Sequence, residues 1–402
     1  MITLADVKAA YERIHKSIYL SPCTLSATFS QLTGNSIYLK LDNLQRTGAF
    51  KERGALNKLL TMTVEERGRG VIAASAGNHA QGLAYHAGRL GISAQICMPL
   101  VTPLIKVSAT KAYGADVILY GANYDDTCEE AIRRSQQQHL TFIHPFDDDA
   151  VIAGQGTLGL EMLQQHPEIE AVVVPIGGGG LIGGIACAIK ETNPGVRVVG
   201  VQTTRLPSMK VAVSEGKPVT LPPAATIADG IAVRRAGDRT LPLVQKYVDE
   251  IVTVDEEEIA NAVLLLLERE KTMAEGAGAA AIAAMINRKI EISGKKIAVL
   301  VGGGNMDVTL LSRIIERGLV KDGRLLRLRI HLPDYPGALH RLTGILADHR
   351  ANIVETSYDR TYYGVNLGET AIDITMETRG PEQIAELLSA LEAAGYLHER
   401  VL

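Results

Sequence analysis

The sequence predicts an α/β protein with a small C-terminal domain of a different fold, and three observations support this prediction. Short apolar runs rich in β-branched residues alternate with helical patterns through the first 320 residues. Each run is followed by Gly, Pro or Ser and then by a helical stretch, as buried parallel strands are. Residues 326–402 instead read strand, helix, strand, strand, helix, strand, which is the ferredoxin-like βαββαβ unit.

The pattern of the first domain, residues 1–320, predicts the following strands and helices. The strands are residues 70–75, 93–99, 115–121, 171–177, 196–202 and 295–304, and helices are expected at 78–90 and 256–271. Asp255 and Glu258 form a capping-box pattern before the second of these helices. Residues 171–189 carry no charge, but Pro175 and a run of glycines favour a strand, a turn and a helix start over a membrane span.

Composition narrows the class of protein. The 402 residues are 46% hydrophobic and 21% charged with a net charge of −4, the balance of a soluble globular protein. The absence of a basic block argues against nucleic-acid binding. Cys23, Cys97, Cys128 and Cys187 form no C-x-x-C pair, which indicates a reduced, cytoplasmic protein without a disulfide frame.

The stretch "VVVPIGGGGLIGG" is the strongest local signal for a ligand. Gly177 to Gly180 allow backbone N–H groups to converge on an anion at the start of a helix, although a tight turn alone would also use glycine. Gly178, Gly180 and Gly183 match G-x-G-x-x-G, but the next expected strand ends in Gln202 instead of the acidic residue of a dinucleotide site. A single phosphate ester therefore fits better than a dinucleotide.

Two further loops, residues 74–82 and 301–307, join an expected strand to the segment after it. Ser75 and Asn78 can form hydrogen bonds there, and the loop amides could receive a carboxylate, whereas His79 alone would more often be structural. Three such loops at strand ends would meet in one crevice. Lys51 in "RTGAFKERGA" is either an ordinary surface lysine or the amine that completes a pyridoxal phosphate site.

The motifs "TGAFKERGA", "SAGNHAQG", "GGGGL", "ADGIAV" and "GGGNMD" occur in the order and spacing of the serine/threonine dehydratases, which the chain resembles over residues 5–320. These are fold-type II, tryptophan synthase β-like pyridoxal phosphate enzymes, so the resemblance implies two α/β subdomains. The remaining residues, 326–402, resemble an ACT regulatory domain. Together the two resemblances imply a threonine ammonia-lyase that converts L-threonine to 2-oxobutanoate and ammonia, with L-serine as a weaker substrate.

The resemblance also implies roles for individual residues. Lys51 would bond to the cofactor and then act as the base at the substrate α-carbon, beside Phe50. Asn78 would contact the phenolic oxygen of the cofactor. The cofactor phosphate would be bound by Gly177, Gly178, Gly179, Gly180 and Leu181, and the substrate carboxylate by Ser75, Ala76, Gly77, Asn78 and His79.

Some positions depart from the family pattern or are less specific. Gly302 stands where relatives commonly place a side chain on the pyridine nitrogen, and Ala76 stands where serine racemases carry a serine that delivers a proton. Glu275 and Gly230 would lie near the cofactor, with a helix N-terminus as the plain alternative for Glu275. Asp229 adjoins a cation site in relatives, which makes a monovalent or divalent cation a weak expectation.

The ACT-like segment suggests an effector site or an assembly module. Candidate effector contacts are Leu332, Asp334, Gly337, Ala338, Asn352 and Ile353. Isoleucine or valine would make metabolic sense as effector, whereas the plain alternative is oligomerisation without a ligand. A homodimer or homotetramer is expected by analogy. Two other functions stay open: another fold-type II reaction, such as racemisation or β-replacement, and an inactive amino-acid sensor.

Overall fold

The computed structural model describes residues 1–359 and 368–401, and its chain forms two compact units, Met1–Asp307 and Val308–Leu402. The second unit begins with helix α14 (Val308–Lys321), which contacts strand β11 of the same unit. The sequence-based limits, 1–320 and 326–402, differ from this division at α14. The amphipathic pattern of a helix predicts that it packs on one face, but not which domain it packs against.

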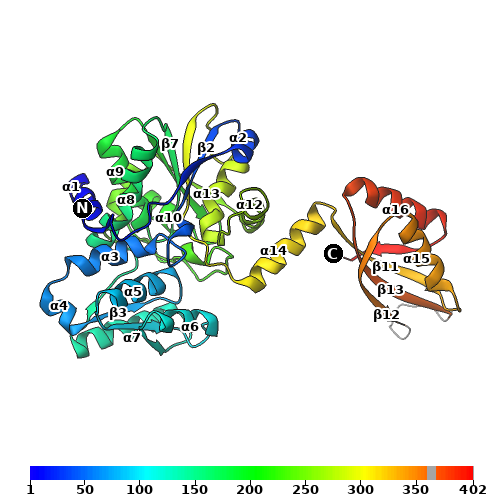
Figure 1. Cartoon of the computed structure of the whole chain (residues 1–402), viewed down its shortest axis with the longest axis horizontal. Helices are drawn as coiled ribbons and strands as arrows, with labels where there is room; N and C mark the ends of the chain where they lie inside the picture. Colours follow the sequence, from blue (N-terminus) through cyan, green and yellow to red (C-terminus); the bar gives the residue numbers. More distant parts are fainter. Residues whose placement is uncertain (360–367, 402) are drawn as a thin grey trace. The chain divides into compact units, whose positions relative to one another are not determined.

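A six-stranded sheet forms the larger half of the first unit (Figure 1). Its strands, in spatial order, are β1 (Cys23–Ser26), β2 (Ser36–Leu41), β10 (Lys296–Val301), β7 (Ala171–Pro175), β8 (Arg197–Thr203) and β9 (Glu250–Val254). Every neighbouring pair is parallel except β1 with β2. Because β10 and β7 are neighbours, the glycine loops that follow them leave the same edge of the sheet.

A four-stranded parallel sheet forms the smaller half of the first unit. Its order is β5 (Asp116–Leu119), β4 (Ala94–Met98), β3 (Val71–Ala74) and β6 (Thr141–Phe142). The central strand β3 is wholly buried and runs directly into the Ser75–Asn78 loop. The predicted α/β class is thus confirmed, and each expected strand of the first domain is present.

Helices cover both sheets, and their bounds follow the chain. They are α1 (Leu4–Ile14), α2 (Ala27–Thr33), α3 (Lys51–Thr61), α4 (Val64–Arg69), α5 (Asn78–Arg89), α6 (Leu104–Ala112), α7 (Tyr124–Gln138), α8 (Asp149–Gln165), α9 (Gly180–Thr192), α10 (Ser208–Glu215), α11 (Thr240–Tyr247), α12 (Glu256–Arg269) and α13 (Gly276–Ile286), with short 3₁₀ turns η1 (Asp42–Leu44) and η2 (Asp229–Ile231). In Figure 1, α8 and α9 lie on one side of the six-stranded sheet and α12 and α13 on the other. The capping box predicted from Asp255 and Glu258 begins α12.

The core of the first unit lies between these layers. Strands β7 and β10 and helices α9 and α13 are apolar on nearly every side and almost fully buried. Helices α8 and α9 approach closely at Gly184, where a Cβ atom would collide with the Ile152 carbonyl. The uncharged run 171–189 forms β7, the glycine loop and most of α9. Among the helices described, none is both long and apolar enough to cross a membrane.

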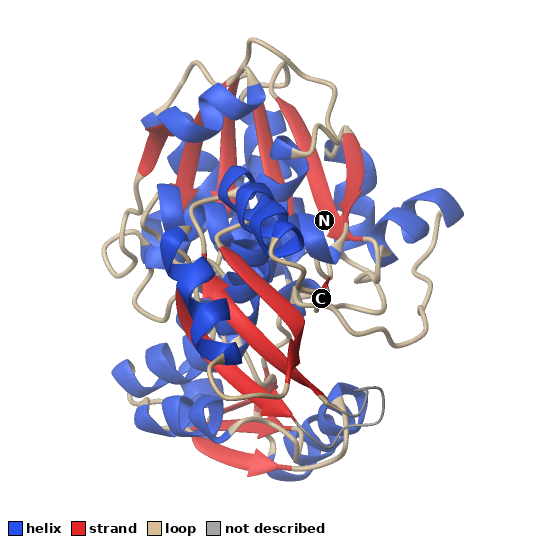
Figure 2. Cartoon of the chain, turned by 90° about the vertical axis from the view of Figure 1, so that its right-hand side faces the viewer, coloured by secondary structure: helices blue, strands red, loops and turns tan. Residues whose placement is uncertain are grey.

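The second unit contains the predicted βαββαβ order. It comprises β11 (Leu325–Pro333), α15 (Ala338–Asp348), β12 (Asn352–Asp359), β13 (Glu369–Glu377), α16 (Pro381–Ala393) and β14 (His398–Arg400), with antiparallel sheet order β12-β13-β11-β14. Both helices lie on one face of this sheet (Figure 2), where Leu342, Leu387 and Leu391 are fully buried. The segments predicted as strands 351–360 and 398–402 each end on a residue outside the described ranges.

Candidate active site

Lys51 begins helix α3, and its half-buried side chain reaches the segment after β6. Its Nζ donates to the Pro145 carbonyl oxygen at 2.9 Å and lies 5.3 Å from the centre of the Phe50 ring. Burial lowers the pKa of the Lys51 amine to about 8, against the opposing charge of Glu275. A substantial fraction of this amine is therefore neutral near physiological pH, which is the form that attacks an aldehyde.

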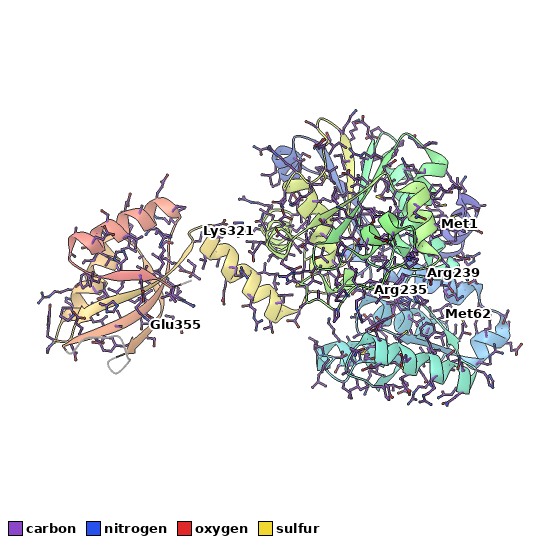
Figure 3. The ribbon with its side chains drawn as sticks, turned by 180° about the vertical axis from the view of Figure 1, so that it is seen from behind. Met1, Met62, Arg235, Arg239, Lys321 and Glu355 are labelled. Carbon is purple, nitrogen blue, oxygen red and sulfur yellow. The ribbon has the colours of Figure 1, made fainter. Side chains whose placement is uncertain are left out.

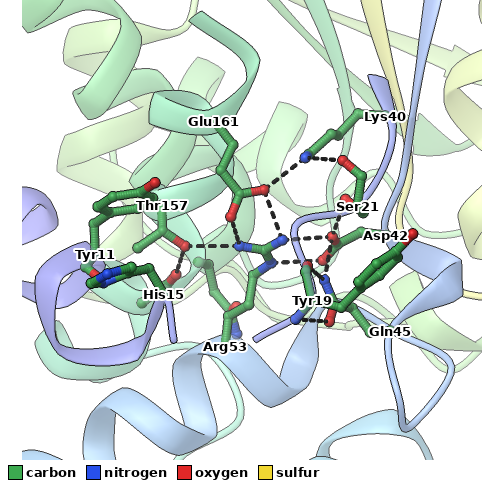
Figure 4. Close-up of polar contacts among 12 residues, drawn as sticks. Tyr11, His15, Tyr19, Ser21, Lys40, Asp42, Gln45, Arg53, Thr157 and Glu161 are labelled. Atoms are coloured by element: carbon green, nitrogen blue, oxygen red, sulfur yellow. Dashed lines mark hydrogen bonds and ion pairs between the residues drawn. The ribbon is translucent and has the colours of Figure 1, made fainter. Parts of the chain in front are cut away.

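A buried ionic cluster holds the first turn of α3 in place (Figure 4). Arg53 donates to both carboxylate oxygens of Asp42 at 2.8 Å and to Glu161 Oε1 at 2.5 Å, and Lys40 Nζ lies 2.6 Å from Glu161 Oε2. Burial opposes the charged form of Asp42, but Arg53 outweighs it and holds the pKa of that carboxyl below its usual value. Two positive and two negative charges thus compensate one another two residues from Lys51.

The glycine loop after β7 offers unpaired backbone amides at the start of α9. The amides of residues 177–181 donate to no acceptor within the described parts of the chain. Two hydrogen bonds fix the position of the loop: the Gly178 carbonyl accepts from Thr240 Oγ1 at 2.6 Å and from the Gly237 amide at 3.2 Å. Gly179 has a φ of +97°, and a Cβ there would collide with Met209. These converging donors fit an anion.

The loop after β3 presents a second set of amides. The Ser75 amide pairs with the Cys97 carbonyl, while Ser75 Oγ accepts from the Gly77 amide at 3.2 Å. The amides of Ala76, Asn78 and His79 have no acceptor among the described residues. At the N-terminus of α5 they could bind a carboxylate.

His79 itself is buried, and its Nε2 lies 3.1 Å from the Ile143 carbonyl oxygen. Burial, aided by the positive charge of Lys51, lowers the pKa of His79 to about 3. The imidazole therefore stays neutral at physiological pH, and its hydrogen bond fixes it against β6 and the segment after it. Among the residues predicted for the substrate carboxylate, His79 offers its backbone amide and not its side chain.

Glu275 brings a buried carboxyl beside this loop. It is the N-cap of α13, is 6% exposed, and accepts from Asn78 Nδ2 at 2.7 Å. Asn78 Oδ1 in turn accepts from Asn305 Nδ2 at 2.8 Å. Burial, with the nearby charge of Asp229, raises the pKa of Glu275 to about 8. Lys51 and Glu275 thus act on one another electrostatically, and the pKa of each is moved to about 8.

Gly302 lies against the ring of Phe50. Its carbonyl accepts from the Phe50 amide at 2.9 Å, and a Cβ atom at this position would lie 3.2 Å from Phe50 Cδ1. Gly302 therefore allows Phe50 to pack tightly on the loop after β10. Gly230 is near as well, since a Cβ there would lie 3.1 Å from Glu275 Oε1.

Asp229 occupies the exposed side of η2. Its carboxylate forms an ion pair with Lys106 Nζ at 3.2 Å. Within the residues described, no group of three or more His, Cys, Asp or Glu side chains could hold a metal ion. The weak expectation of a cation near Asp229 therefore has no such cluster of protein ligands behind it.

Sequence reasoning missed the segment after β6, which closes the site between the two subdomains. His144 Nδ1 accepts from the amides of Phe146 and Asp147 at 3.2 and 2.8 Å, and the next residue, Pro145, accepts from Lys51. The Asp147 carboxylate accepts from the amide of Arg239 at 2.9 Å. Figure 3 shows Arg239 and Arg235 where the subdomains meet. The motif "HPFDD", residues 144–148, is visible in the sequence, but only the fold shows that it lies beside Lys51.

The candidate effector residues form two groups at opposite ends of the sheet of the second unit, because Leu332 pairs with Thr370 near the start of β13, whereas Asn352 pairs with Glu377 at its end. Leu332 and Ala338 are buried, whereas Gly337, with a φ of +92°, is the exposed N-cap of α15. The Asp334 amide donates to the Gly368 carbonyl at 2.9 Å. On β12, Asn352 Nδ2 donates to Glu377 Oε2 at 2.8 Å, and Ile353 is 36% exposed.

The first unit has the donors that pyridoxal phosphate requires. The aldehyde needs an amine that can lose its proton, which Lys51 supplies through its lowered pKa. The phosphate ester needs converging N–H donors, which the unpaired amides of residues 177–181 supply. The ring of Phe50 lies beside the Lys51 amine, and the charge of Glu275 acts on that amine. Asn78 donates a hydrogen bond to Glu275. These residues fit the cofactor.

Comparison with known proteins agrees with this geometry. Residues 14–303 match the family model "Pyridoxal-phosphate dependent enzyme", and residues 326–395 match the ACT domain. The chain is 48% identical to the L-threonine ammonia-lyase of Thermotoga maritima, over 98% of each chain, and 48% identical to that of Geobacter sulfurreducens, over 99% of each. It also resembles the solved structure of processed threonine deaminase isoform 2 from Solanum lycopersicum, with 38% identity and a TM-score of 0.75, over 78% of this chain and 86% of that one. The chain therefore belongs to the pyridoxal-phosphate dependent enzymes and carries an ACT domain at its C-terminal end.

Proposed function

We propose that this protein is a threonine ammonia-lyase that converts L-threonine to 2-oxobutanoate and ammonia, with L-serine to pyruvate as its secondary reaction. The observation that carries the proposal is the half-buried Lys51 amine, which donates to the Pro145 carbonyl oxygen and whose pKa is lowered to about 8. Two near-full-length relatives named L-threonine ammonia-lyase support the choice of substrate.

Lys51 would hold the cofactor covalently, and the amides of Gly177, Gly178, Gly179, Gly180 and Leu181 would bind its phosphate. Asn78 would contact its ring hydroxyl, while Phe50, Gly230, Glu275 and Gly302 would surround the ring. When bound, pyridoxal phosphate draws electrons from the substrate α-carbon and so stabilises the charge left there when a proton is removed.

The chain's own residues would position the substrate and move its protons. The unpaired amides of Ala76, Asn78 and His79 at the start of α5 would bind the substrate carboxylate, with Ser75 and Gly77 shaping the loop. Lys51, released as substrate enters, would take the proton from the α-carbon. Water then leaves from the α- and β-carbons, and its later addition at the α-carbon releases ammonia. The net change is threonine to 2-oxobutanoate and ammonia.

Racemisation is the alternative that these side chains support least. It needs a second proton donor on the face of the α-carbon opposite Lys51. Ala76, at the position where racemases carry a serine, has only a methyl group there. β-Replacement and an inactive sensor remain the other readings, and turnover of L-threonine would exclude the sensor.

We further propose that an amino acid regulates the enzyme at the ACT domain. Leu332, Asp334, Gly337 and Ala338 of one copy of the chain would contact the effector together with Asn352 and Ile353 of a second copy, since the two groups lie at opposite ends of the sheet in one chain. Isoleucine and valine are the first candidates because 2-oxobutanoate feeds isoleucine synthesis. Regulation of this kind requires a measurable coupling between the two sites. A homodimer or homotetramer in the cytoplasm completes the proposal, in keeping with four cysteines that are all free thiols.

The test is the formation of 2-oxobutanoate from L-threonine by wild type and Lys51→Ala, with the absorbance spectrum recorded between about 400 and 430 nm. A cofactor band with product that depends on Lys51 is the expected result. A band without product from L-threonine would overturn the substrate assignment. Absence of any band from wild type would overturn the cofactor site.

A further inference from the structure

Three side chains form a line of hydrogen bonds across the candidate site. Asn305 Nδ2 donates to the Thr47 carbonyl oxygen and to Asn78 Oδ1, at 2.8 Å in each case. Asn78 Nδ2 then donates to Glu275 Oε1 at 2.7 Å. The three side chains come from the loop after β10, the first residue of α5 and the N-cap of α13.

The direction of this line is fixed at its Thr47 end. A backbone carbonyl can only accept, so the Asn305 atom that faces it must be the amino nitrogen. The same nitrogen meets Asn78, so Asn78 must present its carbonyl oxygen in return. The amino group of Asn78 is thereby turned to Glu275 Oε1. An amino group has a second hydrogen, and the described residues accept no further bond from it.

Two glycines make room for this arrangement. A Cβ atom at Gly48 would collide with Asn305 Oδ1, and a Cβ atom at Gly303 would collide with Glu275 Oε1. At Gly303 the added carbon would also lie 3.1 Å from Asn78 Nδ2. The backbone on both sides is therefore built around these three side chains, which limits their freedom to turn.

We propose that Asn305 is a positioning residue, which sets the orientation of the Asn78 amide so that its free N–H points to the ring hydroxyl oxygen of the cofactor. The proposal rests on the proposed function, because it presumes that pyridoxal phosphate lies against Asn78. Asn305 acts through Asn78 and touches neither substrate nor cofactor. Its effect on the cofactor is electronic, because a hydrogen bond to the ring oxygen favours the oxygen's charged form.

Glu275 is the acceptor at the far end, and its surroundings make its charge sensitive to this line. Asp229 from η2, Lys106 from α6 and Lys51 from α3 are the charged groups that face it, and Asn78 from α5 is its hydrogen-bond partner. Reversal of the Asn78 amide would place Asn78 Oδ1 against Glu275 Oε1, which is unfavourable whenever the carboxyl is ionised. Loss of Asn305 would therefore alter the pH response of the site as well as its affinity.

Asn305→Asp is the variant that tests the proposal most sharply. Aspartate has the same size and shape but no N–H, so it cannot donate to Thr47 or to Asn78. The matched control is Asn43→Asp. Asn43 Nδ2 also donates two hydrogen bonds of 2.8 Å, to Thr272 Oγ1 and the Met273 carbonyl oxygen, but it makes no contact with Asn78.

Three properties are measured on the purified full-length holoenzymes: the pH midpoint of the cofactor absorbance band, the Kd of pyridoxal phosphate after its removal, and kcat and KM for L-threonine. For Asn305→Asp we expect a shift of the band's pH midpoint by about one unit and a Kd at least about tenfold higher. For Asn43→Asp we expect a wild-type midpoint and a Kd within about twofold of wild type. A lower midpoint of thermal unfolding is expected for both variants, so this quantity does not distinguish them.

The outcomes separate the proposal from the proposed function. A wild-type enzyme without a cofactor band would remove the proposed function itself. A normal wild type with an Asn305→Asp variant whose midpoint and Kd are unchanged, or are changed equally in Asn43→Asp, would overturn the role of Asn305. If Asn305→Asp does not fold, Asn305→Ala serves the same comparison, because it removes the donor without adding a charge. Its expected changes have the same direction and smaller size.

Discussion

Two groups of charges meet at the start of α3, where Lys51 and Arg53 lie two positions apart, and they are built in opposite ways. Arg53, Asp42, Glu161 and Lys40 compensate one another at 2.5–2.8 Å. Lys51 and Glu275 have no partner of opposite charge within salt-bridge distance among the described residues, and burial moves the pKa of each to about 8. The first group stabilises the fold around α3, whereas the second is left with protonation states that can change.

The largest effect is expected from a substitution of Lys51, in the group without ion pairs. Lys51→Met should lower the rate of 2-oxobutanoate formation by at least about a thousandfold, because it removes the nucleophile and the base together. Its free energy of unfolding should not fall, because a half-buried amine without a counter-ion is replaced by an apolar side chain of similar size. Product assay and urea unfolding of the cofactor-free chain measure the two quantities. Retention of activity would contradict the assignment of Lys51.

The next largest effect is expected from a substitution of Arg53, in the group whose charges compensate one another. Arg53→Met leaves Asp42 and Glu161 as buried carboxylates with only Lys40 to balance them. We expect a loss of about 3–5 kcal/mol in the free energy of unfolding, or failure to fold. Urea unfolding followed by circular dichroism gives the value, with the exposed Arg133→Met as a control. A loss below about 1 kcal/mol would show that the cluster does not hold α3.

The dependence of stability on pH sharpens the comparison. The pKa of Glu275 is raised in the folded chain, so its protonated form favours folding, and that contribution is lost as pH rises from about 4.5 to 8. The pKa of Lys51 is lowered, so its contribution grows as pH rises from about 8 to 10.5.

The cofactor-free chain should therefore lose stability between about pH 6.5 and 8, by about 2 kcal/mol from Glu275, because the opposite contribution of His79 is complete by about pH 6.5. Glu275→Gln should remove the slope between about pH 6.5 and 8 and keep the one above it. Thermal unfolding between pH 5 and 10 measures both slopes. Identical slopes in variant and wild type below pH 8 would show that Glu275 is ionised throughout.

The smallest effect is expected for a solvent-exposed ion pair. Lys106 and Asp229 form an exposed ion pair at 3.2 Å between α6 and η2. Lys106→Met should change the free energy of unfolding by less than about 1 kcal/mol, and the difference should shrink further in 1 M salt. A larger or salt-independent loss would mean that this pair acts like the buried cluster and not as a surface contact.

Periodicity and glycine placement predicted the layers of both units, because strands such as β7 and β10 are apolar along their whole length. The resemblance predicted Lys51 and the glycine loops, since these are contiguous motifs. Partners far apart in sequence carried no local signal: Arg53 and Glu161 are 108 positions apart, and Asn78 and Asn305 are 227 apart. The division of the chain at α14 was also beyond local patterns, because it depends on which domain the helix contacts.

The comparison of Lys40 with Lys51 tests the distinction between the two groups of charges most directly. Lys40 is compensated and Lys51 is not, so Lys40→Met and Lys51→Met should show opposite behaviour in the same pair of assays. We predict that Lys40→Met lowers the free energy of unfolding by a few kcal/mol and keeps activity per folded molecule within about tenfold of wild type. Lys51→Met should keep its stability and lose 2-oxobutanoate formation. If both variants lose stability and both keep activity, the distinction between the two groups of charges is wrong.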